Sequence, residues 1–354
     1  MSSKALEGPP DGLPPRHCAV CHVRDKISRC TGCQVVYYCG RAHQAADRKR
    51  HKVACKEIER MVELYESIDI SIRIGLGPGD DLETALRLSP DDMETMTYLR
   101  AQHTYSQALL LESTIDAVEI SLDEQWSVLE VDMHDKLRVR DYMPHLMIRL
   151  GQDQEAYDFI KWWTLATDER IRYHDWDDPT APRMNLTGED AFEPVDDLVK
   201  RKKLFGHKNA VLLIKIRLYL DLRDICNADR ALRRGNKSGM FPSEVIDNIK
   251  RHNVRSGIVR ARRDLVENDG FVASLRMAEL KKQIRELARG IFDKDVPEYG
   301  GTMDEMFSNT QAAWDETPWA MRTLQDAVRG IAKMSQHNPA WATRSRGLYK
   351  TSSG

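Results

Sequence analysis

The sequence has no long hydrophobic run and almost no net charge. Its longest apolar run within a predicted helix, residues 210–214, is far shorter than the roughly 20 residues that cross a membrane. Its 53 Lys and Arg and 55 Asp and Glu give a formal net charge of −2. The lack of a long apolar run argues against a membrane protein. The small net charge argues against nucleic-acid binding by the chain as a whole, although it does not exclude a local basic patch.

Cysteine is absent from most of the chain. Six of the seven cysteines lie between Cys18 and Cys55, and the seventh, Cys226, stands alone. The first residues carry no apolar segment of the kind found in a secretory signal peptide. A protein that keeps clustered thiols for metal belongs in a reducing compartment, so we expect the nucleus or the cytoplasm.

Eight potential zinc ligands fall in the stretch from residue 18 to residue 55. They come as four pairs with the spacings of zinc sites, namely Cys18-x2-Cys21, Cys30-x2-Cys33, Cys39-x3-His43 and His51-x3-Cys55. Two tetrahedral sites use all eight, so the stretch predicts two structural Zn²⁺ ions per chain. A segment of this size needs such staples, each worth on the order of 10 kcal/mol of folding free energy.

The four pairs can be combined in sequence or interleaved. Interleaving is slightly favoured, because only then does each metal link distant parts of the stretch into one unit. A short β-type run over residues 34–38 predicts a strand of a small hairpin. Residues 41–55 lack Pro and Gly and predict a helix, which continues in pattern to about Ile74.

The spacing and several residues between the ligands resemble a MYND-type zinc finger. The residues shared with that family, besides the ligands, are Tyr38, Gln44, Asp47 and Lys52. The resemblance implies interleaved sites, with the first zinc on Cys18, Cys21, Cys39 and His43 and the second on Cys30, Cys33, His51 and Cys55. His43 stands where the family usually has Cys, and His is an equally good ligand.

A second departure from the family concerns the partner surface. MYND fingers that bind proline-rich peptides use a Gln and a Trp, and the equivalent positions here hold Gln44 and Arg48. From residue 16 to residue 56 the chain has ten Lys and Arg against two Asp, densest at residues 48–52. We predict partner binding through Gln44, Arg48, Lys49 and Arg50. A solvated basic face and a nucleic-acid surface are the alternatives, and the resemblance favours protein.

The remaining chain predicts a mainly α protein. The expected divisions are a disordered leader at 1–16, the finger at 17–56, a helical repeat-like domain at 57–335 with a loop insertion at 173–194, and a disordered tail at 336–354. Within the helical part, Asp80 or Asp81 is expected to cap a short helix, and Pro90 to stand in the first turn of the next one.

A weak repeat runs through the helical domain. A Leu precedes an Ala by six residues at Leu111, Leu150 and Leu222. The copy at residues 145–157 resembles a tetratricopeptide-type hairpin, in which Gly151 ends the first helix in the left-handed conformation and Ala156 allows close packing. An irregular helical bundle is the alternative. The finger followed by a long helical region is similar to a group of fungal MYND proteins.

No catalytic constellation is recognisable. The glycine-rich residues 75–79 follow a predicted helix rather than the buried strand that a cofactor-binding loop requires. The Asn-His and Asp-Tyr signatures of SET-type lysine methyltransferases are missing, and the ligand spacings are not those of a RING finger. Cys226, His145 and His207 lack a nucleophile's partners. We therefore predict a non-enzymatic, zinc-binding protein-interaction module, which the resemblance places in transcriptional or developmental regulation. A divergent protein methyltransferase and a nucleic-acid-binding finger are the alternatives.

Overall fold

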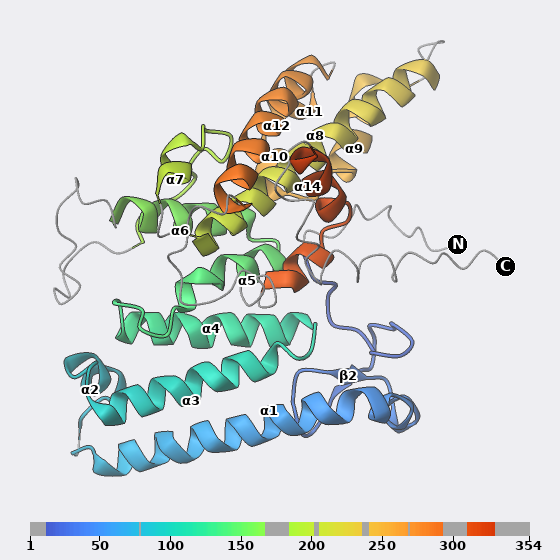
Figure 1. Cartoon of the computed structure of the whole chain (residues 1–354). Coiled ribbons are helices and arrows are strands. Elements are labelled where there is room, and N and C mark those ends of the chain that lie inside the picture. Colours follow the sequence, from blue (N-terminus) through green and yellow to red (C-terminus); the bar gives the residue numbers. More distant parts are fainter. Residues whose placement is uncertain are drawn as a thin grey trace. The chain divides into compact units, whose positions relative to one another are not determined.

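The computed structural model describes residues 12–77, 79–166, 184–201, 205–235, 241–267, 270–292 and 310–329. The chain is mainly α, as the sequence predicts (Figure 1). It divides into two compact units, whose described residues lie mainly in 12–152 for the N-terminal unit and in 153–165 and 186–329 for the C-terminal unit. No helix within the described ranges is long and apolar enough to cross a membrane.

The N-terminal unit joins a small two-stranded sheet to a layer of helices. Its elements are β1 (Ser28–Arg29), β2 (Tyr37–Tyr38), α1 (Arg41–Gly75), α2 (Leu82–Leu88), α3 (Met93–Leu109), α4 (Ile115–Val131), the 3-10 helix η1 (Val139–Asp141) and α5 (Met143–Arg149). The strands are antiparallel, with Ser28 opposite Tyr38. The sequence predicts a strand over residues 34–38, but the strand formed is limited to Tyr37–Tyr38. Gln34 (φ 60°) belongs to a turn instead, because it donates its N–H to the Cys30 carbonyl at 3.0 Å.

Helix α1 is the longest helix in the N-terminal unit and passes unbroken through the predicted boundary between residues 56 and 57. Its sequence contains neither Pro nor Gly between Arg41 and Ile74, and it ends at Gly75, as predicted. The side chains that it buries include Ile58 and Met61, one turn apart on one face. In Figure 1 it runs along α3, against which it packs.

Of the two helix starts predicted after α1, one agrees with the structure. Asp81 caps α2 by accepting the Thr84 N–H at 3.0 Å, as predicted. Pro90 does not stand in the first turn of α3. That helix begins at Met93, and Pro90 lies in a preceding turn that the Asp92 N–H closes on the Ser89 carbonyl at 3.1 Å. The sequence placed the helix start too early because Ser89 and Asp92 are both good caps.

Residues 12–16 are held by contacts of Gly12, Leu13 and Arg16, although the sequence assigned them to a disordered leader. The Leu13 N–H donates to the Arg149 carbonyl at 2.7 Å, and the Leu13 side chain is buried. A Cβ on Gly12 would lie 2.4 Å from the same carbonyl, so only glycine allows this approach. Arg16 reaches Asp116 on α4. The sequence could not show these partners, since they lie a hundred residues or more away. The rest of the leader and the predicted tail lie outside the described residues.

Gly151 ends α5 in the way that the sequence predicts. Its φ is 77°, its N–H donates to Ile148 at 3.0 Å, and the next N–H donates to Met147 at 2.9 Å. This pair of hydrogen bonds is a Schellman motif. Because α5 belongs to the N-terminal unit and the next helix to the C-terminal unit, the predicted hairpin crosses the division. The tetratricopeptide-like repeat stays a prediction.

The C-terminal unit is built around one long buried helix. Its elements are α6 (Asp153–Ala166), α7 (Asp196–Lys200), α8 (Phe205–Gly235), α9 (Ser243–His252), α10 (Gly257–Ala261), α11 (Arg263–Val266), α12 (Phe271–Phe292) and α14 (Ala320–Val328), with residues 310–315 also helical. The apolar run at 210–214 is wholly buried on α8. Asp221 of α8 accepts the N–H groups of Arg255 and Ser256. Of the predicted insertion, residues 184–194 are irregular and the remainder lies outside the described residues.

Candidate metal centre

Two cysteine pairs sit on turns of the same form. The His22 N–H donates to the Cys18 carbonyl at 2.9 Å, and the Gln34 N–H donates to the Cys30 carbonyl at 3.0 Å. His22 and Gln34 both have φ of 60°, so each turn closes with a left-handed residue. Such a turn brings the two sulfurs of a Cys-x2-Cys pair to adjacent corners of one site. Helix α1 supplies the remaining histidines and Cys55.

The first tetrad consists of Cys18, Cys21, Cys39 and His43, whose ligand atoms lie within 4.8 Å of one another. The Cys21 and Cys39 sulfurs are 3.6 Å apart. His43 turns its Nδ1 toward the metal position, at 3.5 Å from the Cys18 sulfur and 3.0 Å from the Cys39 sulfur. Cys18 is buried, while Cys21 and Cys39 are exposed.

The second tetrad consists of Cys30, Cys33, His51 and Cys55, again within 4.8 Å. The Cys30 and Cys55 sulfurs are 3.7 Å apart. His51 presents its Nε2 instead, at 3.5 Å from the Cys33 sulfur and 3.4 Å from the Cys30 sulfur. Three of the four ligands are buried, so this site is better shielded from solvent than the first.

Both tetrads fit zinc. Zinc–sulfur bonds of about 2.3 Å at tetrahedral angles put two sulfurs about 3.8 Å apart, and a sulfur and a nitrogen about 3.5 Å apart. The sulfur–sulfur distances of 3.6 and 3.7 Å lie close to the first value. The distances from His51 Nε2 and the 3.5 Å from His43 Nδ1 to the Cys18 sulfur match the second value, while the 3.0 Å from His43 Nδ1 to the Cys39 sulfur is shorter. All seven cysteines are free of disulfides. The arrangement is interleaved, as the family resemblance implies, and is consistent with two zinc ions that cross-link the turns beside the two strands to α1.

A buried carboxylate outside the finger reaches the second tetrad. Glu112, in the connection between α3 and α4, accepts a hydrogen bond from His51 Nδ1 at 2.7 Å, and its side chain is 4% exposed. Its other oxygen pairs with Arg50 at 3.0 Å. Sequence reasoning missed Glu112, because an acidic residue after the apolar run at 108–111 looks like an exposed residue of a helix end.

A second buried carboxylate fastens the finger to α4. Asp116 accepts hydrogen bonds from Arg16 Nε at 3.0 Å, Arg29 Nη2 at 3.2 Å and the Tyr37 hydroxyl at 3.1 Å. It is 3% exposed. Two guanidinium groups and a hydroxyl replace the water that the carboxylate loses on burial. Nearby, the Thr114 hydroxyl donates to the Val35 carbonyl at 2.8 Å.

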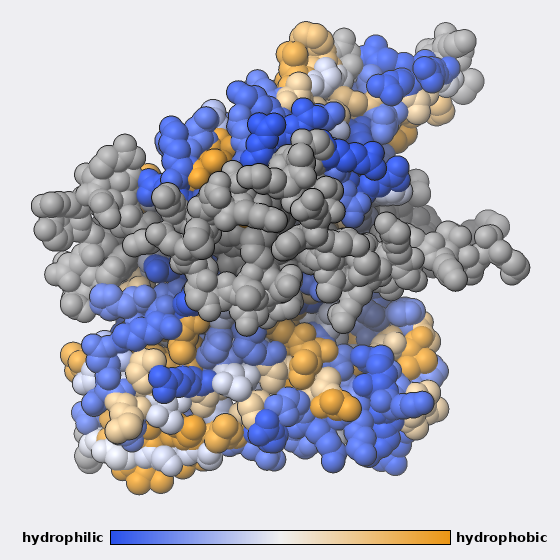
Figure 2. All heavy atoms as spheres, in the orientation of Figure 1, coloured by the Kyte–Doolittle hydropathy of each residue, from blue (hydrophilic) through white to orange (hydrophobic). Residues whose placement is uncertain are grey.

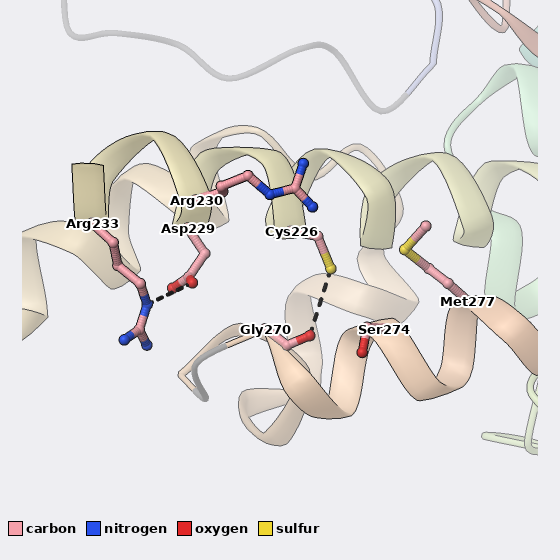
Figure 3. Close-up of a pocket in the computed structure, with 7 residues that line it drawn as sticks. All are labelled: Cys226, Asp229, Arg230, Arg233, Gly270, Ser274 and Met277. Atoms are coloured by element: carbon pink, nitrogen blue, oxygen red, sulfur yellow. Dashed lines mark hydrogen bonds and ion pairs between the residues drawn. The ribbon is translucent and has the colours of Figure 1, made fainter. Parts of the chain in front are cut away.

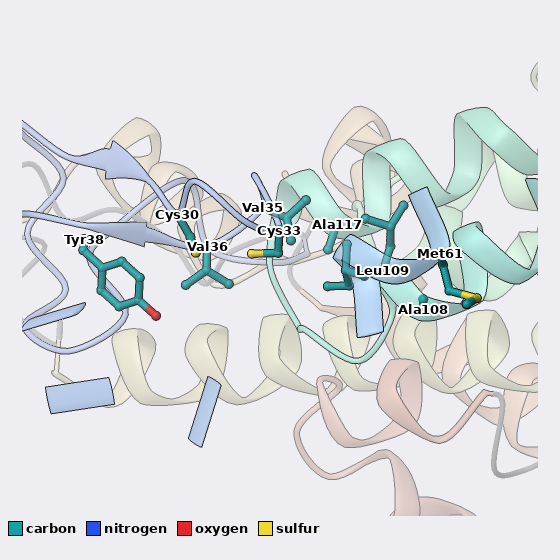
Figure 4. Close-up of a cluster of buried hydrophobic side chains, with 10 residues drawn as sticks. Cys30, Cys33, Val35, Val36, Tyr38, Met61, Ala108, Leu109 and Ala117 are labelled. Carbon is teal, nitrogen blue, oxygen red and sulfur yellow. The ribbon is translucent and has the colours of Figure 1, made fainter. Parts of the chain in front are cut away.

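A continuous apolar cluster lies between these polar contacts. It contains finger residues, two residues of α1 and three of α3 and α4: Cys30, Cys33, Val35, Val36, Tyr38, Ile58, Met61, Ala108, Leu109 and Ala117. Figure 4 shows Val35 and Cys33 beside Leu109 and Ala117. Finger and helices therefore share one hydrophobic core, and the finger is a part of the N-terminal unit rather than an appendage.

The residues predicted to bind partners have different surroundings. Arg48 and Lys49 are exposed on α1. Gln44 is half-buried, with its amide nitrogen 4.0 Å from the Cys30 sulfur. Arg50 is held by Asp47 at 2.7 Å and by Glu112, so its charge is already used within the chain. Sequence reasoning could not separate Arg50 from its neighbours, because Glu112 is distant in sequence.

The remaining candidates form no second centre. Cys226 is half-buried, and its thiol lies 3.6 Å from the Gly270 carbonyl in a pocket of about 460 Å³ (Figure 3). The neighbouring Asp229 pairs with Arg233 and Lys250. His145 and His207 are buried. Trp162 and Trp163 are both buried, with their rings perpendicular, so neither lines an exposed groove.

Comparison with known proteins places the finger in a family. The model of the MYND finger family matches residues 18–55. Searches among curated proteins and among solved structures return no match. The chain thus carries a MYND finger, a zinc module of protein interaction, and its two Cys/His tetrads are consistent with two zinc ions.

Proposed function

We propose that the chain is a non-enzymatic interaction module whose finger docks an acidic segment of a partner protein along α1. One observation carries the proposal. Several exposed cations on α1 form no ion pair with any described part of the chain. We call them the cationic stripe, which consists of Arg41, Arg48, Lys49, Lys52 and Lys56. In the lower part of Figure 2, hydrophilic side chains dominate the surface at the finger end of the N-terminal unit.

Helical spacing aligns the cationic stripe. Arg41, Arg48, Lys52 and Lys56 are separated by seven, four and four residues, which puts them on one face of α1 over about 22 Å. Cations left without partners repel one another and are relieved by an anionic ligand. The stripe therefore suits a negatively charged segment of about four turns of helix or six extended residues.

Two features favour a protein over a nucleic acid. Val53 lies beside the stripe with 77% of its surface exposed, which offers an apolar contact that a phosphate backbone does not use. Farther along the same face stand Glu59 and Glu63, both exposed, which would repel a longer polyanion. Arg48 also replaces the Trp on which proline-rich peptides stack, so acidic rather than proline-rich segments fit this finger.

The proposal of a non-enzymatic role is supported by the end of α1 and by the strands that the structure contains. The glycine-rich segment begins at Gly75, the last residue of α1, and the strands within the described ranges are the two of the finger. A loop that cradles a nucleotide cofactor follows a strand of a parallel sheet. Calorimetric titration with S-adenosylmethionine tests the methyltransferase alternative. We expect no heat of binding at millimolar ligand, and saturable binding would contradict the proposal.

Selection from a random peptide library tests the docking face. The zinc-loaded full chain should enrich peptides rich in Asp and Glu, and their affinity should fall about tenfold when Arg48 and Lys49 are both replaced by Glu, because contacts at a docking site are worth a kcal/mol or more. The matched control replaces Lys281 and Lys282 on α12 with Glu, and this variant should keep the affinity of the parent chain for the selected peptides. Enrichment of proline-rich peptides, or equal affinities for all variants, would contradict the proposal.

The same preparation separates the nucleic-acid alternative. Binding of a labelled 30-base-pair DNA should be weak, whereas a dissociation constant that rises steeply with salt would support that alternative instead.

We extend the proposal to a regulatory role in the nucleus or the cytoplasm, supported by six thiols that must stay reduced to hold metal. A fluorescent fusion of the full chain tests the location, and secretion would contradict it.

A further inference from the structure

Glu112 lies outside the matched finger, yet it touches a zinc ligand. We propose that Glu112 is a positioning residue of the second zinc site, which fixes the His51 ring so that its Nε2 faces the three thiolates. The inference rests on the two zinc tetrads and is independent of what the finger binds.

The two ring nitrogens of His51 face different groups, one the Glu112 carboxylate and the other the cysteine sulfurs. Nδ1 lies 2.7 Å from Glu112 Oε1, while Nε2 lies 3.5 Å from the Cys33 sulfur and 3.4 Å from the Cys30 sulfur. A carboxylate can only accept, so Nδ1 carries the proton and donates it. Nε2 is left with the lone pair that a metal requires. The carboxylate thus selects both the tautomer and the orientation of the ligand.

The carboxylate is itself held in place. Arg50 Nη1 pairs with Glu112 Oε2 at 3.0 Å, and Arg50 Nη2 pairs with Asp47 at 2.7 Å. Asp47 also accepts from the Tyr38 hydroxyl at 2.8 Å. This chain of contacts gives the buried carboxylate a charged partner and limits its rotation, which offsets the cost of burying it. Asp47 and Tyr38 are residues of the MYND pattern, whereas Glu112 is added by the helical layer.

The first zinc site has no such support. Within the described parts of the chain, the His43 ring makes hydrogen-bond-range contacts only with the sulfurs of Cys18 and Cys39, through Nδ1. Cys21 and Cys39 are also exposed, whereas the second tetrad keeps three ligands buried. The second zinc should therefore leave more slowly than the first, and part of that difference should belong to Glu112.

Zinc release tests the proposal in the full chain loaded with two zinc ions. Addition of excess chelator with a colorimetric zinc indicator should give two phases of equal amplitude. Glu112→Ala should accelerate the slow phase about 10- to 100-fold and leave the fast phase unchanged, which is the usual effect of removing a hydrogen-bond partner of a ligand. Glu112→Gln retains an acceptor oxygen and should give a smaller acceleration.

Asp116→Asn is the matched control. Asp116 is buried to the same degree and ties the finger to the same helices, but it touches no ligand. It should leave the slow phase unchanged. An equal acceleration by Asp116→Asn would overturn the proposal, because the effect would then belong to packing of the finger on the helices. Unchanged slow phases in both Glu112 variants would also overturn it.

A measurement on the unaltered chain keeps the proposal testable where a variant does not fold. In protein labelled with ¹⁵N-histidine, long-range ¹H–¹⁵N correlations distinguish protonated from metal-bound ring nitrogens. His51 should show a protonated Nδ1 and a metal-bound Nε2, and His43 a metal-bound Nδ1. A metal-bound Nδ1 at His51 would overturn the proposal.

Discussion

At the scale of single residues, the ligand at position 43 shows how the site tolerates change. His43 takes the corner that the family usually gives to Cys, and its Nδ1 reaches the sulfurs of Cys18 and Cys39. Nδ1 is the ring nitrogen nearer to the backbone, so His43 reaches the metal position in the shorter of its two ways, which is the closer match to a cysteine side chain. The substitution is therefore conservative in geometry as well as in chemistry.

This geometry predicts the zinc content of two variants. His43→Cys should still bind two zinc ions per chain, while His43→Ala should bind one, since three thiolates without a fourth ligand hold the metal less well. Native mass spectrometry of the intact chain gives the count directly. Two zinc ions in His43→Ala would contradict the ligand assignment.

A buried lysine in the C-terminal unit predicts a pH dependence. Lys215 on α8 is fully buried and donates to the Glu193 carbonyl at 2.7 Å. Burial lowers the pKa of its ammonium to about 7, against about 10.4 in an unfolded chain. Between these values the unfolded state binds more protons, so the contribution of Lys215 to stability is lost as the pH falls from about 10 toward 7.

Lys215→Met removes this dependence. Relative to the parent chain, the variant should be most stable at pH 7 and should lose that advantage by pH 9.5, by a free energy on the order of a few kcal/mol. Thermal unfolding midpoints of both proteins across this range provide the measurement. A difference in midpoint that does not change with pH would show that Lys215 is charged over the whole range in the folded protein.

At the scale of elements, α1 determines how finger and helices share a core. Ile58 and Met61 belong to α1 and pack in the same cluster as Cys33 and Val35 of the finger and Leu109 of α3. The helix therefore does two jobs, since its first turns hold zinc ligands and its middle turns fill the core of the N-terminal unit.

Truncation of Ile58 tests this role of α1. Ile58→Ala should lower the free energy of unfolding of the N-terminal unit by about 2–4 kcal/mol, because it leaves a cavity in a buried cluster. Val53→Ala on the same helix is the control and should change it by less than about 0.5 kcal/mol, since Val53 is 77% exposed. Equal effects of the two substitutions would mean that the cluster does not contribute to stability.

At the scale of the whole molecule, the two units should respond differently to metal removal. Both tetrads lie in the N-terminal unit, and the eight ligands are distributed over the turns and loops before α1 and over α1 itself. Chelation should lower the unfolding temperature of that unit by at least 10 °C, given the folding free energy that structural zinc supplies. The transition of the C-terminal unit should stay within about 2 °C, because it holds none of the ligands. Calorimetry of the full chain with and without chelator separates the two. A loss of both transitions would show that the units unfold together.

The metal site was predictable from the sequence, while its surroundings were not. Ligand identity and spacing are local properties, and so is the helix from Arg41 to Gly75, which follows from a run without Pro or Gly. Glu112 and Asp116 are different, because their roles depend on pairings across sixty to a hundred residues. No local pattern distinguishes them from solvent-exposed acids. The same reason explains why Arg50 was grouped with Arg48 and Lys49, and why residues 12–16 were expected to be disordered.

Helix α1 has a consequence for how related sequences can vary in length. Each residue added to a helix rotates everything beyond it by about 100°. An insertion or deletion between His43 and Met61 would turn Ile58 and Met61 away from the shared core, or the ligands away from the zinc. Relatives that keep both the metal site and the helical layer should thus keep the number of residues in this interval unchanged, and gain or lose residues in the segment between α1 and α2 instead.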